Sequence, residues 1–396
     1  MSTYHVVVIG AGYAGTIATN RFLGSLTPTE AGRVRVTVIN PRADFVERIR
    51  FHELAAGSRS DVAIPLPDVL HPAAEVLVGT ATRIAERAVT VRTGAGDELD
   101  VPFDRLLYAP GSIAAAPIPG AREHAFLLGD LDGAQRAAEA IRATGPGARV
   151  LVVGGGATGV EAAAEVAERH PRAQVTLASA TPVVAFMRPA AQRSIRRTLG
   201  RLGVTIVDGT PVTLVEAGRA RLEDGRTLGF DVCLVAASFV APRLAAASGL
   251  PVDEIGRLHV DEYLRAGPAI VGAGDAVVLP ERVGAHLRMA CATALPLGAH
   301  AASILLADLR GERPEPASIG FAAQCLSLGR RAGYFQPTRL DDTPRPLHVG
   351  GRPAAWIKEL ICRLTVASPR RERSHPGAFP AVRGPKVAAG AAAPGR

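Results

Sequence analysis

The stretch RVLVVGGGATGVEAAAEVAERH, from Arg149 to His170, decides the fold of this chain. Its apolar start, Val150 to Val153, is typical of a buried strand, and its end, Val160 to Arg169, has the pattern of a helix. Glycines at GxGxxG spacing lie between them. In such a unit the glycines permit the turn, the approach of a pyrophosphate and close helix–strand packing. The stretch therefore predicts a dinucleotide site with candidate residues Gly154, Gly156, Ala157, Thr158 and Gly159.

The same pattern occurs at the N-terminus, in YHVVVIGAGYAG, which starts at Tyr4. A strand from Val6 to Ile9 leads into a second GxGxxG turn and a helix. The next strand, RVRVTVIN, ends at Asn40, where an acid normally reads the ribose; an asparagine can still hydrogen-bond a ribose hydroxyl. The candidate residues of this site are Gly10, Ala11, Gly12, Tyr13, Ala14, Gly15 and Asn40.

Two fingerprints in one chain indicate two nucleotides, and the chemically useful pair is a flavin with a nicotinamide dinucleotide. The strand after the second fingerprint, AQVTLAS, ends in Ala178 and Ser179 rather than in an acid. A carboxylate there would hold the ribose of NADH and repel the 2′-phosphate of NADPH. Ser179 is therefore a candidate contact for either nicotinamide. We predict an α/β protein with two Rossmann-like domains, FAD as cofactor, and NADH or NADPH as co-substrate.

The composition is that of a folded protein: 47% of the 396 residues are apolar and 21% are charged. That length can hold two or three domains. Arg, Glu, Gly or Pro interrupts every apolar run before about 20 residues, so we expect no membrane-spanning segment. The N-terminus enters a strand without the basic and apolar regions of a signal peptide. These features favour a cytoplasmic location.

The formal charge of +8 is concentrated near the C-terminus. From Gly351 onward nine Lys or Arg residues face only Glu359 and Glu372, a net +7, which leaves +1 for the rest of the chain. A high net charge of this origin is weak evidence for nucleic-acid binding, so we expect no nucleic-acid partner. The cysteines lie far apart without a CxxC pair, and the histidines lack ligand spacing. We therefore expect reduced, mostly buried thiols and no metal site.

The chain resembles flavoproteins with two dinucleotide-binding domains, and more closely the type II NADH dehydrogenase (NADH:quinone oxidoreductase) family, over roughly residues 4–371. The second flavin motif of the family resembles the end of the stretch GRLHVDEYLRAGPAIVGAGDAV, from Ile270 to Ala276. In that motif Asp275 would accept hydrogen bonds from the ribityl chain. FDRLLYAPGS (Phe103 to Ser112) resembles the strand that returns toward the flavin. The resemblance further implies flavin contacts at Pro41, Arg42, Arg48, Ala81, Ala109, Pro110, Gly111, Gly274, Asp275, Ala294 and Leu295.

Three further points follow from the resemblance. Asn40 to Gly57 matches the segment beside the isalloxazine but has no cysteine, which disfavours disulfide reductase and thiol peroxidase activity. Glu161 is the candidate catalytic residue, as an acceptor that orients the nicotinamide carboxamide, or else it is a surface glutamate of the helix. Cys291 is placed near the flavin, as a packing residue. The family's glutamines near the quinone are replaced by Ala292, Pro296 and Leu297.

The implied organisation has one domain inserted in another. Residues 1–117 and 243–311 form the FAD domain, 118–242 the NAD(P)H domain, 312–373 a small α+β cap, and 374–396 a disordered tail. In the cap, Gln324, Ser327 and Leu328 either line an acceptor site or belong to a plain strand.

AAWIKELICRLTV predicts an amphipathic helix within residues 355–373. Basic residues flank its apolar face. Such a helix suits the interface of a membrane, which here would be the inner face of the cytoplasmic membrane. It equally suits packing on its own domain or on a homodimer partner. The apolar face consists of Trp356, Ile357, Leu360, Ile361 and Leu364.

The sequence thus predicts a FAD-dependent NAD(P)H dehydrogenase that passes hydride to flavin N5 and then two electrons to a quinone-like acceptor. One alternative is a pathway-specific flavin oxidoreductase that acts on a dedicated metabolite or carrier protein. Another is a non-catalytic redox sensor that binds flavin and nicotinamide.

Overall fold

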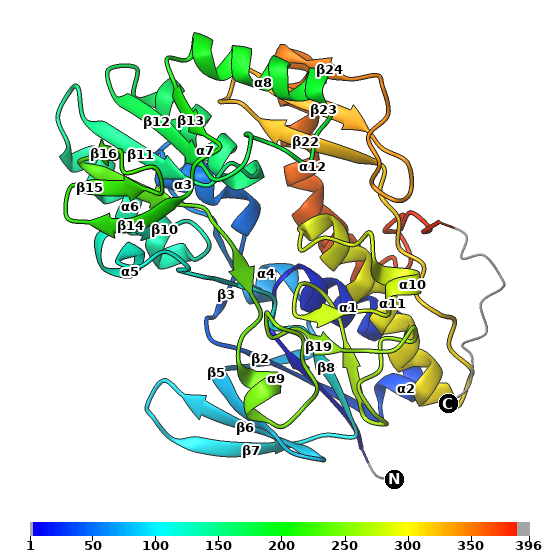
Figure 1. The fold of residues 1–396 in the computed structure, drawn as a ribbon. Coiled ribbons are helices and arrows are strands. Elements are labelled where there is room, and N and C mark those ends of the chain that lie inside the picture. The colour runs from blue at the N-terminus through cyan, green and yellow to red at the C-terminus, as the bar shows by residue number, and fades with distance from the viewer. Residues whose placement is uncertain (1–2, 386–396) are drawn as a thin grey trace, which may run out of the picture.

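The computed structural model describes residues 3–385, and its first sheet contains the first glycine turn (Figure 1). Five parallel strands form its centre, and two antiparallel strands extend one edge. The strand order is β20 (Ile270–Gly272), β8 (Arg105–Tyr108), β1 (Tyr4–Ile9), β2 (Val34–Asn40), β5 (Ala74–Ile84), β6 (Ala88–Thr93) and β7 (Glu98–Pro102).

Two helices, α1 (Tyr13–Gly24) and α11 (Cys291–Arg310), pack closely on each other beside this sheet. A Cβ added at Gly298 would lie 2.3 Å from the Ala14 carbonyl oxygen, so a small residue is required at this crossing. By length and composition alone α11 is long and apolar enough to cross a membrane. Because 67% of its apolar window is buried inside the protein, it is a core helix of this fold.

The second sheet is parallel and contains the second glycine turn; it lies at the upper left of Figure 1. A small antiparallel sheet and three long helices accompany it. The strand order is β10 (Phe126–Leu127), β17 (Val232–Val235), β11 (Arg149–Val153), β12 (Gln174–Ser179) and β13 (Thr205–Asp208). The accompanying elements are α6 (Leu131–Ala143), α7 (Ala157–Arg169), α8 (Pro189–Arg201), β14 (Val212–Glu216), β15 (Arg219–Leu222) and β16 (Thr227–Gly229).

The chain passes between the two sheets through β9 (Ile113–Ala114) and β18 (Phe239–Val240), which pair with each other. Shorter elements fill the remaining connections. They are α2 (Pro28–Ala31), β3 (Asp44–Val46), η1 (Arg48–Arg50), α3 (Phe51–Ala55), β4 (Ala63–Pro65), α4 (Leu66–Val69), α5 (Ala121–His124), α9 (Leu244–Ala247), β19 (Leu258–His259), β21 (Val277–Val278) and α10 (Glu281–Gly284).

The C-terminal cap consists of β22 (Ala323–Ser327), β23 (Gly333–Pro337), β24 (Val349–Gly350) and α12 (Gly351–Glu372). In Figure 1, α12 runs from this small sheet down to α1. Beyond α12 the chain lies against residues 318–320, where the Gly320 amide donates to the Val382 carbonyl over 2.8 Å. The prediction of disorder from residue 374 on is therefore wrong for residues 374–385, and residues 386–396 lie outside the described part.

The predicted α/β class, with two Rossmann-like sheets and a small C-terminal cap, is confirmed. The apolar cores do not follow the sequence divisions, however. Phe51 and Leu54, which the sequence assigns to the first domain, are buried in the core of the second sheet. Leu326 and Leu328 of the cap share that core. The second sheet is thus covered by side chains from all three parts of the chain.

Candidate functional site

The first glycine turn has the three features that the fingerprint requires. Gly10 has a φ of +96°, and a Cβ there would lie 2.3 Å from the Ala109 carbonyl oxygen. A Cβ at Gly15 would lie 1.9 Å from the Gly10 carbonyl oxygen, whereas one at Gly12 would meet nothing within 4 Å. The backbone at Gly12 is therefore open to a pyrophosphate, at the uncapped N-terminus of α1.

The second turn repeats this arrangement. Gly154 has a φ of +130°, and a Cβ there would lie 2.6 Å from the Ala236 carbonyl oxygen. A Cβ at Gly159 would lie 1.9 Å from the Gly154 carbonyl oxygen, and Gly156 is again open. Ala157 and Thr158 begin α7, which has no side-chain cap. Both turns consequently offer backbone amides to a phosphate group.

The two strand ends that would read the ribose differ in how their side chains are used. Asn40 Oδ1 accepts from the Ala11 amide at 3.0 Å, and Asn40 Nδ2 donates to the Arg42 carbonyl oxygen at 2.8 Å. Asn40 thus holds the first turn in shape. Ser179 is buried, and its hydroxyl donates to the Thr181 carbonyl oxygen at 2.6 Å. No acid stands at this position of the second site.

The remaining predicted contacts of the first site lie around its sheet edge. Ala109, Pro110 and Gly111 follow the end of β8 directly. Ala81 lies in β5, three residues beyond the partner of Asn40 in the strand register. Pro41 and Arg42 are exposed after β2, Tyr13 packs edge-on against Phe45, and Ala14 packs under Gly274. The fold therefore gathers these residues at the carboxyl ends of the parallel strands.

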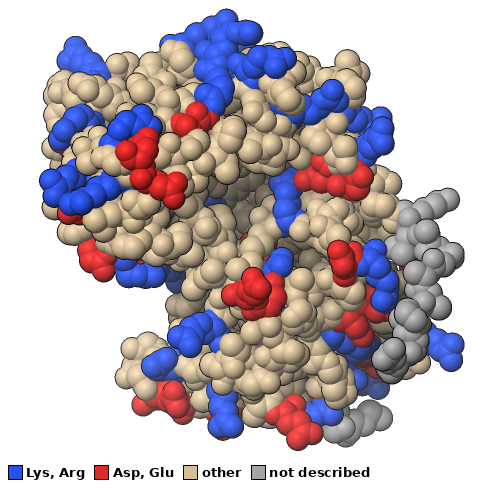
Figure 2. All heavy atoms as spheres, viewed as in Figure 1, with Lys and Arg blue, Asp and Glu red and all other residues tan. Residues whose placement is uncertain are grey.

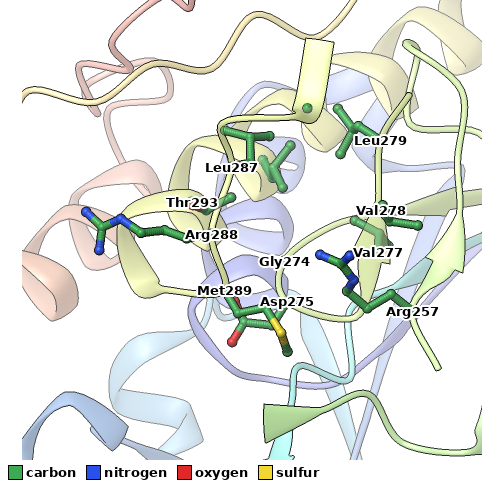
Figure 3. Close-up of a pocket in the computed structure, with 12 residues that line it drawn as sticks. Arg257, Gly274, Asp275, Val277, Val278, Leu279, Leu287, Arg288, Met289 and Thr293 are labelled. Carbon is green, nitrogen blue, oxygen red and sulfur yellow. The ribbon is translucent and has the colours of Figure 1, made fainter. Parts of the chain in front are cut away.

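Asp275 lies just after β20 in a pocket that is lined mainly by apolar side chains, together with Arg257, Arg288 and Thr293 (Figure 3). Its Oδ2 accepts from the Ser112 hydroxyl at 2.9 Å, and within residues 3–385 its Oδ1 has no hydrogen-bond partner. Burial raises the pKa of this carboxyl, while Ser112 and Arg48 act in the opposite direction. Arg48 donates to the backbone oxygens of Ser112 and Gly129. An unpaired buried acceptor beside an open glycine turn fits the hydroxyls and pyrophosphate of FAD.

The first turn of α11 carries the predicted flavin contacts Ala294 and Leu295. The helix begins at Cys291, and the amide of Ala294 already donates to the Ala290 carbonyl oxygen at 2.9 Å. Ala294 and Leu295 are buried past the first amides of the helix. The amides that precede any intrahelical partner are those of Cys291 and Ala292. These free amides precede Ala294 and Leu295, the residues predicted to contact the flavin, by one helical turn.

Glu161 forms a buried ion pair that the sequence did not predict. Lys358 Nζ of α12 lies 3.0 Å from Glu161 Oε1, and the Ser327 amide donates to the same oxygen at 2.9 Å. Burial opposes the charge of Glu161, but Lys358 and the adjacent His52 outweigh it and hold its pKa below the usual value. Glu161 raises the pKa of Lys358 in turn, against burial. Lys358 and Lys386 are the only lysines of an arginine-rich chain, and this rarity was the one feature of the sequence that singled out Lys358.

Three thiols that are far apart in sequence surround this pair. Cys291, Cys325 and Cys362 come from α11, β22 and α12, and burial raises the pKa of each thiol. Burial raises the pKa of Cys291 to about 11 and that of Cys362 to about 12, so the thiols are protonated near neutral pH. Within residues 3–385 no group of His, Cys, Asp or Glu is arranged to hold a metal ion.

Both glycine turns, the Asp275 pocket and the Glu161 pair belong to a molecule with a hollow between its two sheets (Figure 2). This fold and site define a two-dinucleotide oxidoreductase. The chain belongs to the pyridine nucleotide-disulphide oxidoreductase family, whose model matches residues 4–294. It is an oxidoreductase of the NADH dehydrogenase-like kind within that family, as its relatives indicate.

Among curated proteins, the chain is 32% identical to an NADH dehydrogenase-like protein of Mycobacterium tuberculosis, over 90% of this chain and 92% of that protein. Among solved structures, the sulfide:quinone oxidoreductase of Aquifex aeolicus matches with a TM-score of 0.79 at 20% identity, covering 95% and 93% of the two chains. NDH2 of Plasmodium falciparum in complex with NADH matches with a TM-score of 0.78 at 13% identity, covering 94% and 96%. The predicted resemblance is confirmed.

Proposed function

We propose that this protein is a FAD-dependent NAD(P)H dehydrogenase that delivers two electrons to a quinone. The observation that carries the proposal is the pair of open glycine turns in one chain, with Glu161 on the helix of the second turn paired to the buried Lys358 of α12. A dehydrogenase with two nucleotides requires two such cradles, whereas a binding module for one nucleotide requires one.

The residues of the first site are suited to hold FAD. The turn from Gly10 to Gly15 receives the pyrophosphate, and Asp275 Oδ1 accepts from the ribityl hydroxyls. Arg48, which is itself held by two backbone oxygens, fixes the loop around Ser112 beside that carboxylate. When bound, FAD accepts two electrons as hydride at N5 and passes them on.

The residues of the second site are suited to hold the nicotinamide dinucleotide. The turn from Gly154 to Gly159 receives its pyrophosphate, and Glu161 lies just inside the helix that follows. Lys358 keeps Glu161 ionised and therefore an acceptor, as orientation of a carboxamide requires. Because Ser179 is not an acid, the second site carries no carboxylate at this position to select NADH, and the co-substrate is NADH or NADPH.

The outer face of α12 supports the quinone as acceptor. Trp356, Leu360 and Leu364 are 68%, 41% and 47% exposed, while Lys358 and Glu372 of the same helix point inward. The helix therefore buries charge and exposes apolar side chains, together with the basic Arg363. An interfacial helix of this kind on the inner face of the cytoplasmic membrane would bring the protein to a lipid-soluble quinone. Use of this face for a homodimer is the competing outcome.

Anaerobic reduction and quinone turnover test the proposal. Purified protein reconstituted with FAD should show flavin absorbance, bleach on addition of NADH or NADPH, and recover colour with menadione. Failure to retain FAD, or no bleaching by either nicotinamide, would contradict it.

A second candidate, a flavin oxidoreductase with a dedicated metabolite or carrier protein as acceptor, is favoured by one observation. Ala292, Pro296 and Leu297 stand where the resembling family carries glutamines, and Pro296 and Leu297 are buried. Rapid bleaching by NADH without turnover by any quinone would select this alternative.

A further inference from the structure

The helix of the second glycine turn carries a row of acids that face outside its own domain. Glu161, Glu165 and Glu168 of α7 follow one another at helical spacing, so they share one face. Glu161 pairs with Lys358, and the other two carboxylates of this face also bind residues of the cap. Glu168 accepts from the backbone amides of Arg330 and Arg331, the latter at 3.3 Å.

The turn between β22 and β23 fits tightly against this row. Gly329 has a φ of +81°, and a Cβ there would lie 2.7 Å from the carboxyl carbon of Glu168. The cap therefore approaches α7 through its backbone, and the positive φ favours glycine at the tip. The next residue, Arg330, is delivered to the middle of the row.

The Arg330 side chain joins three parts of the molecule. Its Nε lies 3.0 Å from a Glu165 carboxylate oxygen of α7, and one NH group lies 3.1 Å from Glu53 of α3. Its other NH group donates to Ser327 in the cap at 2.7 Å. The Arg330 side chain is 37% exposed, but those of Glu165 and Glu53 are only 1% and 4% exposed.

The buried acids are not independent of the rest of the site. Glu165 also accepts from Ser58 at 2.5 Å, and Glu53 also pairs with Arg50 at 2.8 Å. Arg50 in turn binds both oxygens of Glu359 on α12, at 2.9 and 3.0 Å. Burial raises the pKa of Glu165, and Arg330 acts against that shift. Removing Arg330 would leave the buried Glu165 carboxylate without a counter-charge, while Glu53 would keep its pairs with Arg50 and Arg59.

The relative orientation of the two sheets depends on non-covalent contacts as well as on the covalent connections between them. The covalent connections consist of the two-residue strands β9 and β18 and the loops around them. The apolar contacts of Leu326 and Leu328 hold the parts together but are not directional. Charge-assisted hydrogen bonds with fixed geometry are directional. Hydride transfer between two bound rings requires reacting atoms roughly 3–3.5 Å apart, and a 1 Å error can cost about a hundredfold in rate.

We propose that Arg330 is a positioning residue for hydride transfer: its links to Glu165 and Glu53 hold the second glycine turn in register with the flavin side. This inference rests on the proposed NAD(P)H dehydrogenase function. It assigns to a residue of the cap, distant from both fingerprints in sequence, control over the geometry between them.

The test compares R330M with R331M in the FAD-loaded enzyme. Both variants keep the backbone amides that bind Glu168, and only the first removes the guanidinium between Glu165 and Glu53. For R330M we expect flavin bleaching at saturating NADH to slow at least tenfold, with FAD content unchanged and the NADH dissociation constant within about threefold. R331M should stay within twofold of the native rate.

Hydrogen exchange supplies a readout that does not depend on reduction. Amides of residues 157–169 should exchange at least tenfold faster in R330M than in R331M, without any nicotinamide present. Equal exchange and equal bleaching in the two variants would overturn the proposal. If R330M does not fold, R330K keeps the charge but cannot bridge two carboxylates, and should show a smaller change of the same kind. A native enzyme that is not bleached by nicotinamides would contradict the proposed function, while the exchange difference would still decide the role of Arg330.

Discussion

The two glycine turns have the same backbone chemistry but are anchored to the molecule in different ways. The helix of the first turn packs against α11 through Gly298 and Ala14, at backbone contact distance. The helix of the second turn is docked on the cap by ion pairs of two of its residues, Glu161 and Glu165, whereas α1 adds the Arg21–Glu372 pair to its close packing. Close packing of small residues suits a cofactor that stays bound. A polar docking face suits a site that must admit and release a co-substrate.

The largest expected effect separates the two turns directly. A methyl group at Gly15 or Gly159 would lie 1.9 Å from a backbone oxygen, so either alanine variant must distort its turn. We expect G15A to lose FAD and all activity. G159A should keep FAD but bleach with NADH at least a hundredfold more slowly. Flavin absorbance per protein and stopped-flow bleaching measure the two effects, and loss of FAD in both variants would contradict separate sites.

The next effect concerns the anchoring of the first turn. Arg21 of α1 pairs with Glu372, whose side chain is fully buried at the end of α12, at 2.7 Å. Burial alone would raise the pKa of Glu372, but Arg21 and the amides of Phe379 and Gly377 hold it below the usual value. E372Q should lower the free energy of unfolding by about 3–5 kcal/mol at pH 7, because a buried charge loses its partner.

The pH dependence of this difference has a definite sign. A depressed carboxyl pKa contributes stability above the unfolded pKa of about 4.3, and this contribution is lost as the pH falls through the lower folded pKa. The native protein and E372Q should therefore differ fully above about pH 5 and converge at lower pH in urea unfolding. E139Q, at an exposed position of α6, is the control. A difference that is independent of pH would argue against an ionised Glu372.

A smaller effect is expected at the ribose position of the second site. S179E places a carboxylate at the end of β12, where it would repel the 2′-phosphate of NADPH. We expect the NADPH:NADH ratio of kcat/KM to fall about tenfold, with S179A as the control for loss of the Thr181 hydrogen bond. An unchanged ratio would show that the ribose lies elsewhere.

The smallest effect concerns the exposed face of α12. L360S removes one apolar side chain from this face and should weaken binding to anionic vesicles by about tenfold or less. L340S is a matched control, because Leu340 is similarly exposed, at 44%, but lies outside α12. Equal vesicle binding of L360S, L340S and the native protein would refute the membrane assignment. A concentration-dependent change of mass in L360S alone would favour a dimer.

The glycine turns, the strands before them and the predicted α/β class could be read from the sequence because each is a local pattern. A GxGxxG between an apolar run and a helical period specifies its own backbone. The apolar face of α12 was also readable, since helical spacing alone defines it. The side of α12 that is buried could not be predicted from this spacing, because the inward face carries the charged residues Lys358 and Glu372.

The contacts that complete the site depend on residues that only tertiary structure brings together. Almost two hundred residues separate Glu161 from Lys358 in the sequence. More than one hundred and sixty separate Glu165 from Arg330. The spacing that predicts a helix says nothing about which distant chain segment covers its face. The sequence by itself determined the two nucleotide cradles, since local dihedral and packing requirements specify them. Only the tertiary structure decided what surrounds these cradles, because the buried charges beside the second one come from three separate parts of the chain.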